Sequence, residues 1–173
     1  MKIIQLFLVV SILVFYSCEN PNPNETGTGE DELKSLEIGR VLEKSDRKFE
    51  DVIYVPIYSE IYLDKTNQNS LLAATLSIRN TSLKDSLFVT VIDYYHTDGS
   101  LVRSYLNQPI VISPMGTVNY VVEKDDTTGG AGANFIVSLS SDSPDIKPLI
   151  QAVMIGGTGN KAFCFSTDGY SLK

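Results

Sequence analysis

The sequence predicts an all-β domain, an antiparallel sandwich with an immunoglobulin-like arrangement as first choice and a small β-barrel as second. Eight short segments rich in β-branched and aromatic residues follow one another from residue 52 onward. Turn-forming residues separate these segments, and no long apolar pattern with a helical period interrupts them. Many short strands joined by turns are typical of sandwiches and barrels.

The first predicted strand contains a proline, whereas the second alternates regularly and ends at a turn. Residues 52–58 (VIYVPIY) favour a strand, and Pro56 predicts an edge position or a bend because proline cannot donate to a ladder. Apolar and polar side chains alternate over 72–79, which indicates a half-buried strand. Asn80-Thr81-Ser82 then turns the chain.

The later strands are joined by recognisable turns. Residues 87–95 predict a strong strand, and Asp98-Gly99 predicts a hairpin to 101–106. Ser113-Pro114-Met115-Gly116 fits a type I turn because proline is second and glycine fourth. The remaining strands are predicted at 118–122, 135–139, 150–155 and 162–166.

Residues 1–17 predict a lipoprotein signal peptide. Lys2 precedes the apolar run Ile3–Tyr16, which is shorter than the ~20 residues that span a bilayer. Ser17 and Cys18 follow in the order of a lipobox. We expect cleavage before Cys18 and acylation of this cysteine, which holds the protein on a membrane without crossing it. The alternative is an ordinary signal peptide with a cysteine nearby by chance.

Residues 18–50 are expected to form a flexible acidic tether after the lipidated cysteine. Residues 19–32 read ENPNPNETGTGEDE and offer no apolar side chain that could offset the entropy of ordering. About 30 residues of coil extend roughly 30 Å from a bilayer. A loose apolar stripe over 31–50 predicts a short helix, and residues 51–173 are expected to form the single domain in the cell envelope.

Charge and cysteine content exclude several classes of site. The net charge of −7 disfavours nucleic-acid binding, which requires an excess of lysine and arginine. The second of the two cysteines, Cys164, has no partner once Cys18 is acylated, so no disulfide or cysteine-based zinc site is expected. Its position between Phe163 and Phe165 predicts a small apolar side chain in a strand rather than a reactive thiol.

Five segments carry a family resemblance: YVPIYSEIY (54–62), LLAATLSIRNTS (71–82), VIDYYHTDGSLVRSYL (91–106), TGGAGANFIVSL (128–139) and QAVMIGG (151–157). Together they resemble the bacterial family catalogued as domain of unknown function 3124, over roughly residues 52–166. The resemblance implies a secreted or lipid-anchored bacterial domain without an established activity. In that family an acidic residue often stands where this chain has His96.

The most unusual local sequence is 127–134 (TTGGAGAN). A phosphate-binding loop needs backbone N–H groups ahead of a helix, often with a lysine, whereas a strand is predicted to follow here. We expect a glycine-rich turn that supplies positive φ. The alternative is a loop that shapes a binding groove with Asp125 and Asp126.

No catalytic residue, metal or cofactor is assigned. His96, the single histidine, precedes the predicted hairpin turn and lies in no hydrolase motif, so we expect an exposed structural role. The acids lack the spacing of an EF-hand loop, and a Ca²⁺ site is the minor alternative for them: Asp93, Asp98, Asp125 and Asp126.

The tyrosines are expected first to serve in the core and corners of the sandwich, where such folds use tyrosine. The alternative is a recognition surface, because tyrosine is enriched at interfaces. Tyr54 and Tyr58 are predicted to share one strand face, whereas Tyr94 and Tyr95 point oppositely. The candidate recognition surface comprises Tyr54, Tyr58, Tyr94, Tyr95, Arg103, Asp125, Asp126 and Asn134.

The leading functional hypothesis is a noncatalytic module that is anchored to a membrane and binds an envelope protein, a glycan or a small ligand. The first alternative is an envelope hydrolase with paired carboxylates, Asp93 with Asp125 or Asp126. The second alternative is a structural accessory subunit of an envelope assembly.

Overall fold

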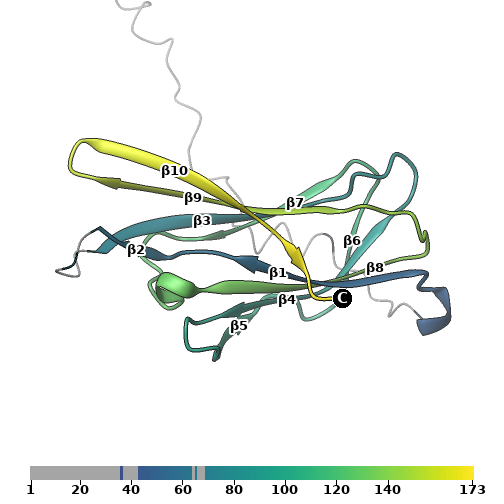
Figure 1. Cartoon of the computed structure of the whole chain (residues 1–173). Helices are drawn as coiled ribbons and strands as arrows, with labels where there is room; N and C mark the ends of the chain where they lie inside the picture. Colours follow the sequence, from purple (N-terminus) through teal and green to yellow (C-terminus); the bar gives the residue numbers. More distant parts are fainter. Residues whose placement is uncertain (1–35, 37–42, 64, 66–68) are drawn as a thin grey trace, which may run out of the picture.

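Two antiparallel β-sheets pack against each other in the computed structural model, which describes residues 36, 43–63, 65 and 69–173 (Figure 1). The predicted signal peptide, Cys18 and most of the expected tether and short helix lie outside the described residues. Within the described part, none of the helices has the length and apolar character needed to cross a bilayer.

The first sheet has the strand order β11-β1-β8-β4-β5, and β6 also pairs with β4. β1 and β8 are distant in sequence but adjacent in space, with Phe49 opposite Ser141 and Pro56 opposite Asn134. The bounds are β1 (Phe49–Pro56), β4 (Leu87–Tyr95), β5 (Leu101–Ser104), β6 (Ile110–Ile112), β8 (Asn134–Ser141) and β11 (Tyr170–Ser171).

The second sheet has the order β10-β9-β3-β2, and β7 also pairs with β3. β9 and β10 form the long hairpin that is drawn in yellow-green and yellow in Figure 1. The bounds are β2 (Glu60–Tyr62), β3 (Asn69–Arg79), β7 (Thr117–Val122), β9 (Leu149–Thr158) and β10 (Lys161–Asp168). Two single turns of 3₁₀ helix, η3 (Lys44–Asp46) and η4 (Gly130–Gly132), complete the described elements.

The predicted sandwich is confirmed. All eight predicted strands are present, and within the described residues the two sheets do not close into the barrel that was the second choice. The sequence patterns missed β2, β6 and β11, which contain only two or three residues each. Such short strands are too brief to show the alternation by which strands are recognised.

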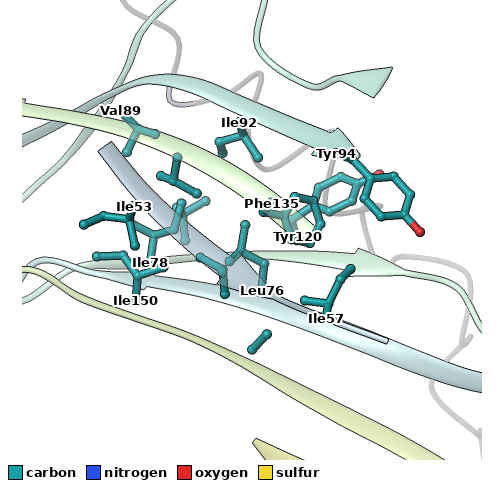
Figure 2. Packing of buried hydrophobic residues seen from close by; sticks show 14 of the residues in the cluster. Ile53, Ile57, Leu76, Ile78, Val89, Ile92, Tyr94, Tyr120, Phe135 and Ile150 are labelled. Atoms are coloured by element: carbon teal, nitrogen blue, oxygen red, sulfur yellow. The ribbon is translucent and has the colours of Figure 1, made fainter. Parts of the chain in front are cut away.

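Alternating apolar side chains build the core between the sheets. In β3 the side chains of Leu72, Ala74, Leu76 and Ile78 are buried, and they face buried residues of β1, β4 and β8. Burying each such leucine or isoleucine contributes about 1.5–3 kcal/mol. Figure 2 shows aliphatic side chains along most of this core and the rings of Tyr94, Tyr120 and Phe135 together at one end.

The turn between β6 and β7 differs from the predicted type I. The backbone N–H of Gly116 donates to Ser113 O at 2.9 Å, so the turn forms, but Met115 has φ +60°. A positive φ at the third position belongs to type II turns, which favour glycine there. Met115 N–H donates to Ser82 O at 3.0 Å, a contact with the β3–β4 loop that proximity in sequence does not reveal.

Candidate functional site

The eight residues predicted as one recognition surface lie in four different places. Tyr54, Tyr95 and Asn134 lie on the outer face of the first sheet, and Tyr94 lies in the core. Tyr58 lies where the chain passes from the first sheet to the second. The other three, Arg103, Asp125 and Asp126, belong to β5 and to the loop after β7.

Tyr94 is a correction to the predicted surface. Tyr94 and Tyr95 do point to opposite faces, as predicted, but the side chain of Tyr94 is 0% exposed. Its ring packs on Phe135 with 5.3 Å between centroids. Burial raises the pKa of the Tyr94 hydroxyl. That hydroxyl lies beside the loop that begins at Gly129, and it is buried without a hydrogen bond of normal geometry to any described residue.

Tyr58 does not share a strand face with Tyr54, because β1 ends at Pro56. The chain then crosses to the second sheet, and the N–H of Ile57 donates to Ala133 O at 3.0 Å. Tyr58 is half-buried and meets Phe165 of β10 edge to face, with ring centroids 5.8 Å apart. The predicted bend at the proline therefore removes Tyr58 from the face that carries Tyr54.

Arg103 and Asp126 belong to a cluster that closes one side of the sandwich between β5 and β7. We call Arg103, Tyr105, Tyr120 and Asp126 the edge cluster. The rings of Tyr105 and Tyr120 lie 3.8 Å apart between centroids, and the Arg103 guanidinium lies 5.6 Å from the Tyr105 centroid. Its position over the ring is that of a cation–π pair.

The charges of the edge cluster act on one another. Burial, followed by a side-chain hydrogen bond with Tyr120, raises the pKa of Tyr105. Electrostatic interaction with Tyr105 raises the pKa of Arg103, and the Asp126 carboxylate contributes in the same direction. Sequence reasoning missed Tyr105 and Tyr120, because their contact joins two sheets. The edge cluster packs the sandwich together, which is a structural role.

The glycine-rich segment is a turn, as predicted. Gly130 has φ +73°, and the hydroxyl of Ser59 donates to its carbonyl oxygen at 3.0 Å. The Thr97 hydroxyl donates to Gly129 O at 2.9 Å and accepts from Gly132 N–H at 2.8 Å. Because protein groups already engage these backbone atoms, the segment links the β4–β5 hairpin to β8.

Three of the four candidate acids are held by hydrogen bonds from near neighbours. Asp93 accepts a hydrogen bond from the Ser104 hydroxyl at 2.7 Å, and Asp126 accepts from Thr128. Asp98 accepts from both the N–H and the hydroxyl of Ser100, which lowers its pKa to about 2. Within the described residues, no three His, Cys, Asp or Glu side chains gather as metal ligands.

The outer face of the first sheet carries a strip of aromatic and aliphatic side chains. Tyr54 lies opposite Ile136 of β8 and Tyr170 of β11. Tyr95 lies opposite Asn134 and Leu101. Residues opposite each other point to the same face, and next-nearest residues along a strand do so too. We call the outer tyrosine strip the set Tyr54, Tyr95, Leu101, Asn134, Ile136 and Tyr170.

The most exposed members of this strip are Tyr170 at 69% and Leu101 at 53%, and the others are half-buried. Leu172 extends the apolar surface beyond β11 and is 55% exposed. The carboxyl group of Asp93 and the amide of Asn134 lie among these side chains and offer hydrogen bonds. The strip therefore combines amphipathic rings with a few polar groups.

A polar groove of about 370 Å³ lies on the same face, nearer to the start of β1. Hydroxyl-bearing Thr90, Ser138 and Ser140 line it together with the charged Arg47, Glu50 and Lys173. Arg47 pairs with Glu50 at 3.0 Å, and this hydrogen bond lowers the pKa of Glu50. The Ser140 hydroxyl is buried there without a hydrogen-bond partner among the described residues. The outer face thus joins a polar groove to an aromatic strip.

Comparisons with known proteins give a family and a distant structure. Residues 50–172 match the family model described as "Protein of unknown function (DUF3124)". No curated protein matches the chain. A solved structure titled "Crystal Structure of Thermotoga maritima 1070" is similar at 15% identity with a TM-score of 0.42, over 69% of this chain and 92% of that chain.

Proposed function

The chain belongs to the family described as protein of unknown function DUF3124, and from this premise we propose that it is a noncatalytic binding module held on a membrane by a lipid on Cys18. The observation that carries the proposal is the outer tyrosine strip with the groove beside it. Aromatic side chains bury large areas at little entropic cost and are enriched where proteins bind partners.

The chemistry of this face favours a partner with both apolar and hydrogen-bonding groups. Tyr54, Tyr95 and Tyr170 offer ring faces and hydroxyls, and Asp93 and Asn134 offer an acceptor and an amide. An envelope protein or a glycan of the envelope has this combination. These are two of the three partner classes that the sequence suggests, the third being a small ligand.

The anchor rests on the sequence of residues 1–18 alone. An apolar run too short to span a bilayer ends directly before Ser17-Cys18. β1 begins at Phe49, so the expected tether would enter the sandwich at the end where η3 lies. The binding face would then be presented roughly 30 Å from the membrane surface.

Among the described residues, the carboxylates of the hydrolase alternative come from different sheets. Asp93 lies on β4 in the first sheet, whereas Asp125 and Asp126 follow β7 in the second. Neither the polar groove nor a second cavity, of about 360 Å³ beside Asp51 and Asp168, is lined by any of these three acids. The accessory-subunit alternative differs from the proposal only in the partner, since the same face would dock on a neighbouring protein.

The anchor is tested by intact-mass spectrometry of the full chain produced in a bacterium. We expect loss of residues 1–17 and a mass increase of a diacylglyceryl group plus an acyl group on Cys18. A Cys18→Ser variant should carry no lipid and should be missing from the membrane fraction. A mature amino terminus without fatty chains would overturn this part of the proposal.

The binding face is tested by capturing envelope proteins and glycans with the wild-type chain and two variants. Tyr170→Ser/Leu101→Ser alters the most exposed members of the strip, so the fold should be retained. Tyr62→Ser is the matched control, because Tyr62 is 61% exposed but lies on β2 in the second sheet. We expect the double variant to lose the captured partner and the control to keep it. Equal capture by all three chains would contradict the proposed face.

A further inference from the structure

β10 is an open edge of the second sheet. It pairs with β9 without interruption, from Lys161 opposite Thr158 to Asp168 opposite Gln151. Among the residues that the structure describes, no strand pairs with its other side. Figure 1 shows β10 along the outside of the sandwich until it crosses toward the first sheet. A row of backbone N–H and C=O groups is therefore available to another strand.

β10 is the longest edge strand among the described residues. The strands β2, β5, β6 and β11 contain two to four residues each and β7 contains six, whereas β10 contains eight. Proteins block edge strands by shortening them or with prolines, bulges and lysines. β10 has no proline and no register shift, and its lysine stands at the first position. An unprotected edge of this length is a template for strand addition.

The part of β10 that is free for pairing is Lys161–Ser166. Beyond it, the Thr167 hydroxyl donates to Pro56 O at 2.6 Å, which brings β10 against β1. On the outer side Cys164 is exposed and lies opposite Ile155, which is itself 55% exposed. Phe163 and Phe165 are half-buried on the other side. The edge therefore has one aromatic side and one side of small residues.

We propose that β10 pairs antiparallel with β10 of a second copy of this chain, forming one sheet across two molecules with Cys164 on the twofold axis. Opposed residues of an antiparallel pair point to the same face, so a twofold axis pairs residues an even number apart. With Cys164 opposite its own copy, Phe163 lies opposite Phe165 of the second copy. This aromatic pair occurs twice, and aromatic cross-strand pairs stabilise antiparallel sheets.

The charges at the two ends of β10 favour the same arrangement. Lys161 begins the strand and Asp168 ends it, so antiparallel pairing brings the positive end of one copy to the negative end of the other. Parallel pairing would bring like charges together. Ala162 lies opposite Ser166 in this register, and both are exposed, small and uncharged. The inference does not depend on the outer tyrosine strip, which belongs to the first sheet.

Charge substitutions at Ala162 and Ser166 test the pairing and its register. Ala162→Lys/Ser166→Lys puts lysine opposite lysine twice, so sedimentation of the full chain in detergent should show a dissociation constant raised about tenfold or more. Ala162→Lys/Ser166→Glu puts lysine opposite glutamate twice and should keep the dimer. Asn119→Lys/Leu149→Lys adds the same two charges at exposed positions off this edge and should have no effect.

A short bismaleimide gives an independent measure of proximity, because its two ends add to the two Cys164 thiols only when they are close. We expect a covalent dimer from the wild-type chain and none from Cys164→Ser. Melting curves confirm that each variant is folded. The proposal is overturned if the wild-type chain is a monomer at every concentration. This holds even if β10 of that monomer captures an added strand-forming peptide, because the proposed partner is a second copy. It is equally overturned if the two-lysine variant dimerises as well as the wild type.

Discussion

Gly129 lies against the hydroxyl of Tyr94, with no room for a Cβ atom between them. The contact joins the aromatic end of the core to the loop that leads into β8, and the Cβ of Ala133 bounds the same space. Glycine is therefore required at 129 by the approach of a side chain, whereas Gly130 is required by its positive φ. The two glycines are adjacent but serve different purposes.

Replacing Gly129 tests this packing. Gly129→Ala should lower the free energy of unfolding by about 1–3 kcal/mol, the usual cost of overpacking a filled site. Urea unfolding followed by circular dichroism measures it. Gly129→Ala/Tyr94→Phe should recover part of the loss, because the hydroxyl oxygen is the nearest atom to the added methyl group. A Gly129→Ala variant as stable as the wild type would contradict the contact.

Removing the Tyr94 hydroxyl alone should cost little. It is buried without a hydrogen bond of normal geometry, so Tyr94→Phe leaves no partner unsatisfied. We expect a change in the free energy of unfolding within about 1 kcal/mol, in either direction. Tyr120→Phe is the comparison, because a side-chain hydrogen bond joins Tyr120 to Tyr105, and its loss should cost about 0.5–1.5 kcal/mol. A larger loss from Tyr94→Phe than from Tyr120→Phe would refute this view of the hydroxyl.

The Asn80 side chain hydrogen-bonds to two loops at one end of the sandwich. Its buried side-chain amide donates to Asp85 O at 2.8 Å, Ile112 O at 3.0 Å and Ser113 O at 3.1 Å. Asn80→Ala should cost about 2–3 kcal/mol, since these carbonyl groups lose a donor. Asn80→Asp should cost at least as much, because a carboxylate would face carbonyl oxygens. Asn119→Ala, at an exposed position, should stay within about 0.5 kcal/mol in the same unfolding assay.

The left-handed Met115 offers a stabilising substitution. Its φ of +60° is unfavourable for any residue with a Cβ, and its side chain is 63% exposed. Met115→Gly should raise the free energy of unfolding by about 0.5–1 kcal/mol, after allowance for the extra freedom of glycine in the unfolded chain. Met115→Ala keeps a Cβ and should give no gain. Equal stability of the two variants would argue against strain at this turn.

Asp98 should make the β4–β5 hairpin sensitive to acid. Hydrogen bonds from the Ser100 hydroxyl and N–H hold its pKa at about 2, below the ordinary 3.8. A carboxyl whose pKa is depressed by folding stabilises above its unfolded pKa, and this contribution disappears as the pH falls from about 4 toward 2. Ser100→Ala should raise the Asp98 pKa and flatten this dependence. An NMR titration of the side-chain carboxyl measures the pKa, and urea unfolding at several pH values measures the dependence. An unchanged pKa in Ser100→Ala would show that the hydroxyl is not the cause.

The sequence patterns were sufficient for the strands whose alternation extends over several residues. β3 and β7 show alternation in their apolar side chains, and those side chains are the buried ones. The patterns failed for the recognition surface, because they treated Tyr58 as continuing the face of Tyr54 and placed Tyr94 among surface residues. The chain leaves the first sheet after Pro56, and Tyr94 belongs to the face that the second sheet covers.

The sequence by itself determined that the chain folds as a sandwich, because the side-chain period of two is a local property that fixes which residues must be buried. It also determined the family, through segments that span most of the domain. Only the tertiary structure decided which strands became neighbours, and therefore that Tyr54 lies beside Tyr170 and that β10 has an open edge. Tyr54 and Tyr170 are more than a hundred positions apart, and no local pattern specifies their contact.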